Sequence, residues 1–163
     1  MQFSDFPFHK SILKAVAEER FQIPTLVQQK AIPLVLEKKN VIVSAQTGTG
    51  KTAAFALPIV QLLFDEQEVE KKDKKIRSLV VTPTRELAIQ ILENFKSFSK
   101  YSNLEATAVF GGVSLEPQKE ILGKGIDILI ATPGRLIDLQ MQGHIDLSAV
   151  EIFVLDEADL MLD

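Results

Sequence analysis

Short apolar runs alternate with stretches of helical periodicity along this chain. Five runs made mainly of apolar residues are candidate strands, at 41–43, 79–81, 106–110, 128–130 and 152–155. Continuous apolar strands are typical of a sheet that is covered on both faces. Because the strands alternate with helices, we predict a doubly wound α/β domain, with a mostly parallel sheet and helices on both faces.

The intervals between these runs have helical patterns. Two apolar stripes recur at helical spacing, one at Ile12, Leu13, Val16 and Ala17 and one at Leu87, Ile91, Phe95 and Phe98. Thr25 is expected to cap a helix that extends through Leu36 and bends at Pro33. Pro58 is expected to kink another helix, because proline removes a backbone hydrogen bond. The densely charged segment 65–75 predicts a solvated loop.

Composition narrows the possible functions. The length of 163 residues suits one domain. The absence of cysteine excludes disulfides, thiol catalysis and cysteine-based metal sites, and two histidines make a His-rich zinc site unexpected. The sequence has neither a signal-peptide pattern nor an apolar run of membrane-spanning length, so we expect a cytoplasmic monomer without membrane contact. The net charge of -4 argues against a polybasic nucleic-acid binder but allows a small phosphate-binding surface.

A glycine-rich segment between a candidate strand and a helical pattern predicts a phosphate-binding loop. It consists of Ala45, Gln46, Thr47, Gly48, Thr49, Gly50, Lys51 and Thr52. Backbone N–H groups of such a loop and of the following helix bind phosphate oxygens. Lys51 is expected to reach the β- and γ-phosphates, and the Thr52 hydroxyl is expected to ligate Mg²⁺. Ala45 stands where the usual fingerprint begins with glycine.

Two adjacent carboxylates, Asp156 and Glu157, directly follow the candidate strand 152–155. We expect them at the C-terminal end of a buried strand, where open α/β sheets bind ligands. Asp156 is the candidate anchor for Mg²⁺, directly or through water. Glu157 is the candidate that orients and deprotonates the attacking water.

With Ala158 and Asp159, these carboxylates form the run Asp-Glu-Ala-Asp. Over essentially all 163 residues the chain resembles the N-terminal RecA-like domain of a DEAD-box RNA helicase, a family in which alanine commonly opens the phosphate loop. The resemblance implies a RecA-like P-loop NTPase fold that uses ATP and Mg²⁺. It implies catalytic roles for Lys51, Asp156 and Glu157, and a role for Asp159 in coupling the site to other motifs.

The segment Phe21–Gln28 resembles the Q motif of this family, within a Q-motif segment of residues 1–30. The resemblance implies that the Gln28 amide reads the adenine edge, that Phe21 stacks on the base and that Phe3 packs nearby. An amide can pair with the adenine edge, whereas guanine presents a different pattern. Arg20 replaces the usual glycine and Ile23 an often basic residue, so we expect adenine recognition to be somewhat altered.

Three further elements resemble the RNA-binding motifs of the family: motif Ia, the GG doublet and motif Ib. Their residues are Pro83, Thr84 and Arg85, then Gly111 and Gly112, then Thr132, Pro133, Gly134 and Arg135. Each element follows a predicted strand, so we expect all three along one edge of the sheet. In the family they grip the sugar-phosphate backbone, which implies RNA as a partner and binding that is independent of sequence.

The family's Ser-Ala-Thr motif is absent from the 163 residues. In the family this motif lies on a strand between the phosphate-loop strand and the DEAD strand. We therefore expect residues 1–163 to form a single N-terminal RecA-like ATP-binding domain that is incomplete at its C-terminus and lacks a central strand. The second RecA-like domain, with its arginine fingers, is also absent. We expect this chain alone to bind nucleotide weakly, to hydrolyse ATP poorly and not to unwind RNA.

The implied function is that of an ATP-dependent RNA helicase that remodels or unwinds short duplexes. An ATP-gated RNA clamp or assembly factor without productive unwinding would carry the same motifs. A GTPase is disfavoured by Gln28 and by the absence of an Asn-Lys-x-Asp guanine motif.

Overall fold

The computed structural model describes residues 1–45, 50–64 and 70–161 of the chain. They fall into two compact units. The N-terminal unit comprises Met1–Gln67 and Asn94–Asn103, and the sheet unit comprises Glu68–Glu93 and Leu104–Asp163. In the part of the chain that is described, no helix combines the length and the apolar character needed to cross a bilayer.

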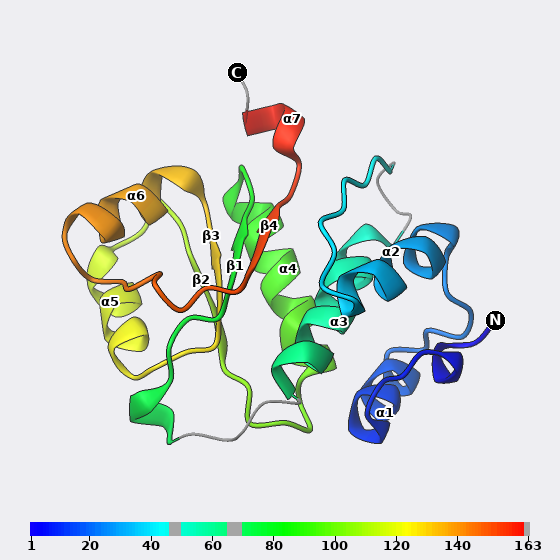
Figure 1. The fold of residues 1–163 in the computed structure, drawn as a ribbon. Helices are drawn as coiled ribbons and strands as arrows, with labels where there is room; N and C mark the ends of the chain where they lie inside the picture. Colours follow the sequence, from blue (N-terminus) through cyan, green and yellow to red (C-terminus); the bar gives the residue numbers. More distant parts are fainter. Residues whose placement is uncertain (46–49, 65–69, 162–163) are drawn as a thin grey trace. The chain divides into compact units, whose positions relative to one another are not determined.

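The N-terminal unit is helical. Its elements are η1 (Phe3–Asp5), α1 (Lys10–Glu18), α2 (Leu26–Leu36), α3 (Lys51–Phe64) and the end of α4 (Arg85–Phe98). Helix α3 is apolar on nearly all sides and is largely buried, as expected for a helix at the centre of a core. Helix α2 packs against it (Figure 1). The Thr25 cap on α2 is confirmed, because its Oγ1 accepts a hydrogen bond from the backbone N–H of Gln28 at 3.3 Å. The bends at Pro33 and Pro58 stay predictions.

The sheet unit contains four strands in the order β2-β3-β1-β4, and all three pairings are parallel. The strands are β1 (Ser78–Val81), β2 (Ala106–Val109), β3 (Ile128–Ala131) and β4 (Ile152–Leu155). Helix α4, α5 (Leu115–Gly123) and α6 (Pro133–Met141) connect successive strands, η2 (Lys71–Asp73) precedes β1, and α7 (Ala158–Met161) follows β4. The prediction of a parallel α/β sheet is therefore confirmed.

One face of this sheet packs against α5 and α6. Its core includes Leu79, Val81, Val109, Leu129 and Ala131, with Leu115, Leu122, Leu136 and Leu139 from the two helices. Helix α4, whose first part belongs to this unit, runs along the other face (Figure 1). Strands β1 and β3 are buried along their whole length, which explains why their sequences are apolar at every position except Ser78.

Two strand predictions need correction. Residues 41–43 form no strand, and the Ile42 and Val43 side chains are 100% and 39% exposed. Strand β4 is not buried, because Phe153 and Leu155 are 57% and 48% exposed. Among the described residues β4 pairs only with β1, and no strand pairs with 41–43. Apolar composition favours a strand, but an extended segment needs a neighbour for its backbone groups.

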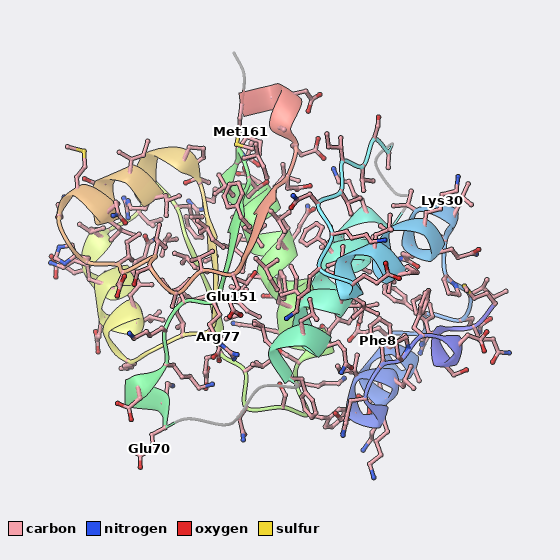
Figure 2. The ribbon with its side chains drawn as sticks, viewed as in Figure 1. Phe8, Lys30, Glu70, Arg77, Glu151 and Met161 are labelled. Atoms are coloured by element: carbon pink, nitrogen blue, oxygen red, sulfur yellow. The ribbon has the colours of Figure 1, made fainter. Side chains whose placement is uncertain are left out.

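A buried ion cluster joins the segments that precede three strands. The Asp127 side chain accepts hydrogen bonds from Lys74 Nζ at 2.6 Å, Arg77 at 3.2 Å and the Glu105 backbone N–H at 2.8 Å. Beside it, the Glu151 N–H donates to the Arg77 carbonyl at 2.9 Å (Figure 2). The prediction that 65–75 is solvated is wrong for Lys74, whose side chain is 8% exposed, because Asp127 draws it inward.

We expect Asp127→Asn to lower the free energy of unfolding by about 3 kcal/mol, because it leaves two cations beside a partner without charge. Urea unfolding followed by circular dichroism measures the change. Asp138→Asn, at an exposed acid of α6, is the matched control and should shift the midpoint little. A loss of equal size in both variants would contradict a special role for the buried cluster.

Candidate functional site

The described part of the phosphate loop lies at the start of α3. Gly50 precedes the helix, and Lys51 and Thr52 are its first two residues. All three are partly buried, as is Ala45, the first residue of the loop. The predicted phosphate-binding residues Gln46, Thr47, Gly48 and Thr49 lie outside the described residues. The N-terminus of a helix presents backbone N–H groups that suit phosphate oxygens, so this end of α3 fits the predicted role.

Gln28 connects the start of α2 to the phosphate loop. Its Oε1 accepts a hydrogen bond from the Thr25 N–H at 2.9 Å, and its Nε2 donates to the Gly50 carbonyl at 3.1 Å. Only 3% of the residue is exposed. A side-chain amide has two N–H donors and an oxygen with two lone pairs, so these contacts use half of its capacity. The remaining half has the donor and acceptor character that reading a base edge requires.

Gly50 is confined by this contact. Its φ is +78°, and a β-carbon built on it would lie 2.4 Å from Nε2 of Gln28. Only glycine adopts this backbone without strain and leaves room for the amide. The phosphate loop and the Q-motif glutamine are therefore fitted to one another.

The two aromatic residues predicted for the adenine site lie together in the N-terminal unit. The Phe3 and Phe21 rings stack with centroids 6.1 Å apart and an interplanar angle of 26°. Phe3 is buried, while 37% of Phe21 is exposed. The Phe21 ring also meets Phe98, at 5.9 Å between centroids. The Phe21 ring therefore packs against two other aromatic rings and keeps part of its surface exposed, as a base-stacking residue requires.

The backbone conformation at Arg20 explains why glycine, the usual residue at this place in the motif that the segment resembles, is suited to the position. Arg20 has φ 62° and follows the C-cap of α1. The N–H of Phe21 reaches the Val16 carbonyl and the N–H of Arg20 reaches the Ala17 carbonyl, which together form a Schellman motif. Glycine suits this left-handed position, so arginine here adds backbone strain. The other departure, Ile23, is 71% exposed.

In the sheet unit, Asp156 and Glu157 directly follow β4. Asp156 is 6% exposed, and its N–H donates to the Val81 carbonyl at 2.8 Å. The Thr82 hydroxyl, which is fully buried, lies 3.5 Å from the Asp156 carboxylate. Glu157 has φ 54°, a conformation that non-glycine residues rarely adopt and that is concentrated at functional sites. Asp159, the predicted coupling residue, is exposed on α7.

Thr82 was missed by reasoning from the sequence. The available signal was its place as the polar residue directly after a strand, the position that Asp156 also holds. Among the described residues no group of three or more histidine, aspartate or glutamate side chains could hold a metal ion. The Thr52 hydroxyl and the Asp156 carboxylate, predicted as Mg²⁺ ligands, are each an oxygen donor of the kind that Mg²⁺ prefers, and they belong to different units.

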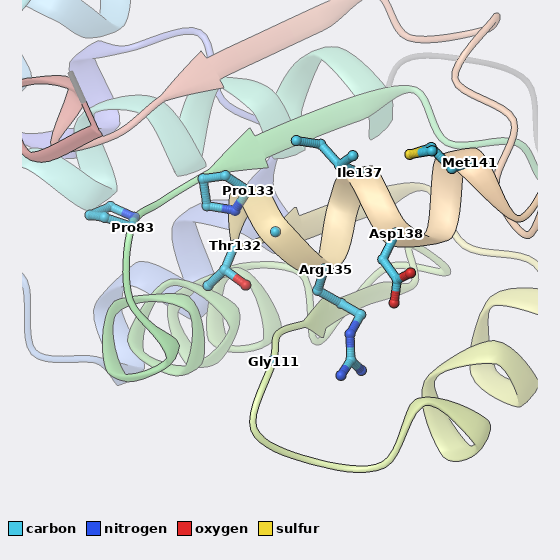
Figure 3. A pocket seen from close by; sticks show the side chains of 9 residues that line it. Pro83, Gly111, Thr132, Pro133, Arg135, Ile137, Asp138 and Met141 are labelled. Carbon is cyan, nitrogen blue, oxygen red and sulfur yellow. The ribbon is translucent and has the colours of Figure 1, made fainter. Parts of the chain in front are cut away.

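The three predicted RNA motifs meet at one pocket of the sheet unit. Its volume is about 600 Å³ (Figure 3), and we call it the edge pocket. Six of the predicted residues line it: Pro83, Gly111, Thr132, Pro133, Gly134 and Arg135. Ile137, Asp138 and Met141 of α6 extend it and were not predicted. The expectation that these motifs lie at one edge of the sheet holds for the structure.

The remaining predicted motif residues are sequence neighbours of residues that line this pocket. Thr84 caps α4, because its hydroxyl accepts a hydrogen bond from the Leu87 N–H at 3.2 Å. The Arg85 guanidinium lies over the Phe110 ring at 5.3 Å, next to the predicted Gly111 and Gly112. Gly112 has φ +80°. Gln118 of α5, a buried residue that was not predicted, hydrogen-bonds both Arg135 and the Phe110 carbonyl.

A parallel α/β sheet, a phosphate-loop sequence at the start of a helix and an Asp-Glu pair after a strand are typical of P-loop nucleoside-triphosphate-binding domains. Comparison with known families agrees: residues 25–163 match the DEAD/DEAH box helicase family, and the chain belongs to it.

Particular relatives carry more specific names. The chain is 45% identical over 163 residues to the ATP-dependent RNA helicase RhlB of Shewanella piezotolerans, covering 99% of this chain and 37% of that protein. It is 45% identical over 161 residues to the DEAD-box ATP-dependent RNA helicase RhpA of Helicobacter pylori, covering 99% and 31%. The crystal structure of a DEAD box protein from the hyperthermophile Methanococcus jannaschii superposes with a TM-score of 0.89 at 37% identity, over 99% of this chain and 43% of that one. The chain thus spans little more than a third of its RhlB relative.

We expect Gly50→Ala to lower the free energy of unfolding by about 2 kcal/mol, because alanine is strained at positive φ and its methyl group displaces the Gln28 amide. Gly123→Ala is the matched control. Gly123 ends α5 with open space around it, so alanine there should be neutral or stabilising. Urea unfolding of both variants tests the difference, and equal midpoints would contradict the fit of Gly50 to Gln28.

Proposed function

We propose that this chain is the ATP-binding domain of an ATP-dependent RNA helicase that remodels or unwinds short duplexes through sequence-independent binding of the RNA backbone. The observation that carries the proposal is the edge pocket, where motif Ia, the GG doublet and motif Ib converge on one unit. Asp156 and Glu157 belong to the same unit. The residues proposed to bind RNA and the two carboxylates proposed for hydrolysis therefore belong to one unit.

ATP binding in this proposal begins with the N-terminal unit. Gln28 reads the adenine edge with the amide groups that Thr25 and Gly50 do not use, and Phe21 stacks on the base. The end of α3 and Lys51 bind the phosphates. The geometry of Gly50 supports this arrangement, because the same carbonyl that orients the amide belongs to the phosphate loop.

Hydrolysis follows from the carboxylates of the sheet unit. The Thr52 hydroxyl and the Asp156 carboxylate are hard oxygen donors that suit Mg²⁺, which when bound neutralises phosphate charge. Glu157 orients a water molecule toward the γ-phosphoryl group and accepts its proton, and ADP and phosphate are the products. Thr82 supports Asp156 from β1, since its hydroxyl lies 3.5 Å from that carboxylate. Asp159 lies on the exposed side of α7, where it can couple the site to a second domain.

We propose that residues 1–163 belong to a single N-terminal RecA-like domain of a longer protein, whose second RecA-like domain supplies the arginine fingers. Two observations support a further strand beside β4: Phe153 and Leu155 are exposed, and among the described residues β4 has β1 as its one partner. An unpaired, apolar strand edge of this kind is normally covered in a native protein.

RNA binding uses the carboxyl edge of the sheet. Helices α4 and α6 begin there, directly after Thr84 and Thr132, so their N-terminal N–H groups can receive phosphates. Arg85 adds positive charge. Contacts of these kinds carry no base information, so affinity should be similar for RNA strands of different sequence.

The test of the function uses the full-length protein. We expect ATP hydrolysis to be stimulated by RNA strands of unrelated sequence, and a short duplex to be separated in the presence of ATP but not GTP. Long-lived RNA binding without strand separation would instead identify an ATP-gated clamp. Equal activity with GTP and ATP, or the absence of RNA stimulation, would overturn the proposal.

We expect Glu157→Gln in the full-length protein to retain ATP binding and to lower the turnover number at least about 100-fold, because the amide cannot accept the proton of water. Glu151→Gln, at the opposite end of β4, is the matched control and should hydrolyse ATP like the wild type. Steady-state hydrolysis and binding of a fluorescent ATP analogue separate the two effects. Unchanged turnover would remove Glu157 from the proposed role.

A further inference from the structure

Arg135 and Gln118 form a hydrogen-bonded bridge beside the edge pocket. One terminal nitrogen of Arg135 donates to Gln118 Oε1 at 2.8 Å, and the other donates to the Val113 carbonyl at 3.0 Å. Gln118 Nε2 donates in turn to the Phe110 carbonyl at 3.1 Å. Figure 3 shows the Arg135 side chain extending from α6 toward the loop that carries Gly111.

The bridge holds the GG loop, residues 110–113, at both of its ends. Phe110 lies directly before the two glycines and Val113 directly after them. Between these anchor points the glycines are exposed and have open space around their α-carbons, and Gly112 has φ +80°. Two adjacent glycines are the most flexible dipeptide a loop can contain. The conformation of their N–H groups therefore depends on how the ends of the loop are held.

The hydrogen-bond partners of Arg135 are protein atoms, which distinguishes it from an arginine whose guanidinium is open to bind a phosphate. A guanidinium has five N–H donors arranged in a rigid fork. Both terminal nitrogens of Arg135 donate to protein atoms, and one of them meets Gln118, which is only 8% exposed. By contrast, Arg85 lies exposed over the Phe110 ring, where its charge is open to a ligand.

We propose that Arg135 and Gln118 are positioning residues for RNA, which hold the GG loop so that its backbone N–H groups meet the sugar-phosphate backbone, and that Arg135 neutralises no RNA phosphate itself. This inference rests on the proposed function and narrows it, because motif Ib then acts through its helix N-terminus and through the loop. Holding the loop in its bound conformation lowers the ordering entropy that RNA binding requires.

Salt dependence separates positioning from direct contact. A side chain that neutralises a phosphate of single-stranded RNA contributes about 0.7 to the slope of log affinity against log salt. A positioning residue lowers affinity and leaves that slope unchanged. The measurement uses the full-length protein with a non-hydrolysable ATP analogue and a fluorescent oligouridine strand, over a series of salt concentrations.

We expect Arg135→Gln and Gln118→Met each to weaken RNA binding about fivefold with the wild-type slope, as for the loss of one net hydrogen bond. The double variant should bind RNA with the same affinity as the single variant that binds less tightly, because both substitutions break one bridge. Arg85→Gln should weaken binding and lower the slope by about 0.7. Lys124→Gln, at the exposed C-cap of α5, controls for the loss of charge, and Gln140→Met, at an exposed position of α6, controls for the change from glutamine to methionine.

Arg135→Lys keeps the charge but cannot reach both partners with a planar fork, so it should bind as weakly as Arg135→Gln. It also serves as the second variant if Gln118→Met fails to fold. Wild-type binding by Arg135→Lys, or a slope reduced by about 0.7 in Arg135→Gln, would overturn the inference and assign Arg135 to a phosphate. Failure of the wild type to bind RNA at all would instead overturn the proposed function.

Discussion

The parallel pairing of β1 with β3 on one side and β4 on the other determines where the chemistry of the sheet unit lies. The hydrogen-bond ladder extends one residue beyond the strands: Thr82 donates to Ala131 at 3.0 Å, Asp156 to Val81 at 2.8 Å and Thr132 to Val109 at 3.1 Å. Each of these residues begins a motif or supports one. Because parallel strands end at the same edge, motifs from distant parts of the sequence are brought together there.

Helix ends organise the candidate sites in both units. In the N-terminal unit, Gln28 completes the cap of α2 and also donates to the carbonyl of Gly50, so the start of one helix contacts the residue that directly precedes another. In the sheet unit, Thr84 caps α4 and Pro133 opens α6. Helix N-termini carry partial positive charge, which suits the phosphates of ATP and RNA without a strongly basic protein. This reconciles the net charge of -4 with a nucleic-acid-binding family.

The Arg135 side chain at the edge pocket bonds neighbouring protein groups. The family resemblance assigns Arg135 to RNA, yet its guanidinium bonds Gln118 and Val113. Asp127 has a comparable organising role before the strands, where it gathers Lys74, Arg77 and the Glu105 backbone. In both cases a charged residue satisfies backbone groups of a neighbouring segment. The sequence pattern around these residues contains no sign of such a role.

The sequence by itself determined much of the secondary structure of this protein and the position of its motifs. Apolar runs located β1 to β4, Thr25 marked the start of α2, and short motifs predicted the phosphate loop and the carboxylate pair. These features depend on neighbours a few residues apart, so a sequence records them. Tertiary structure decided the rest. Residues 41–43 have the composition of a strand but no partner for their backbone, and β4 has apolar side chains that remain exposed. Lys74, Thr82 and Gln118 acquired their roles from groups brought to them by the fold, because burial and pairing depend on residues distant in the chain.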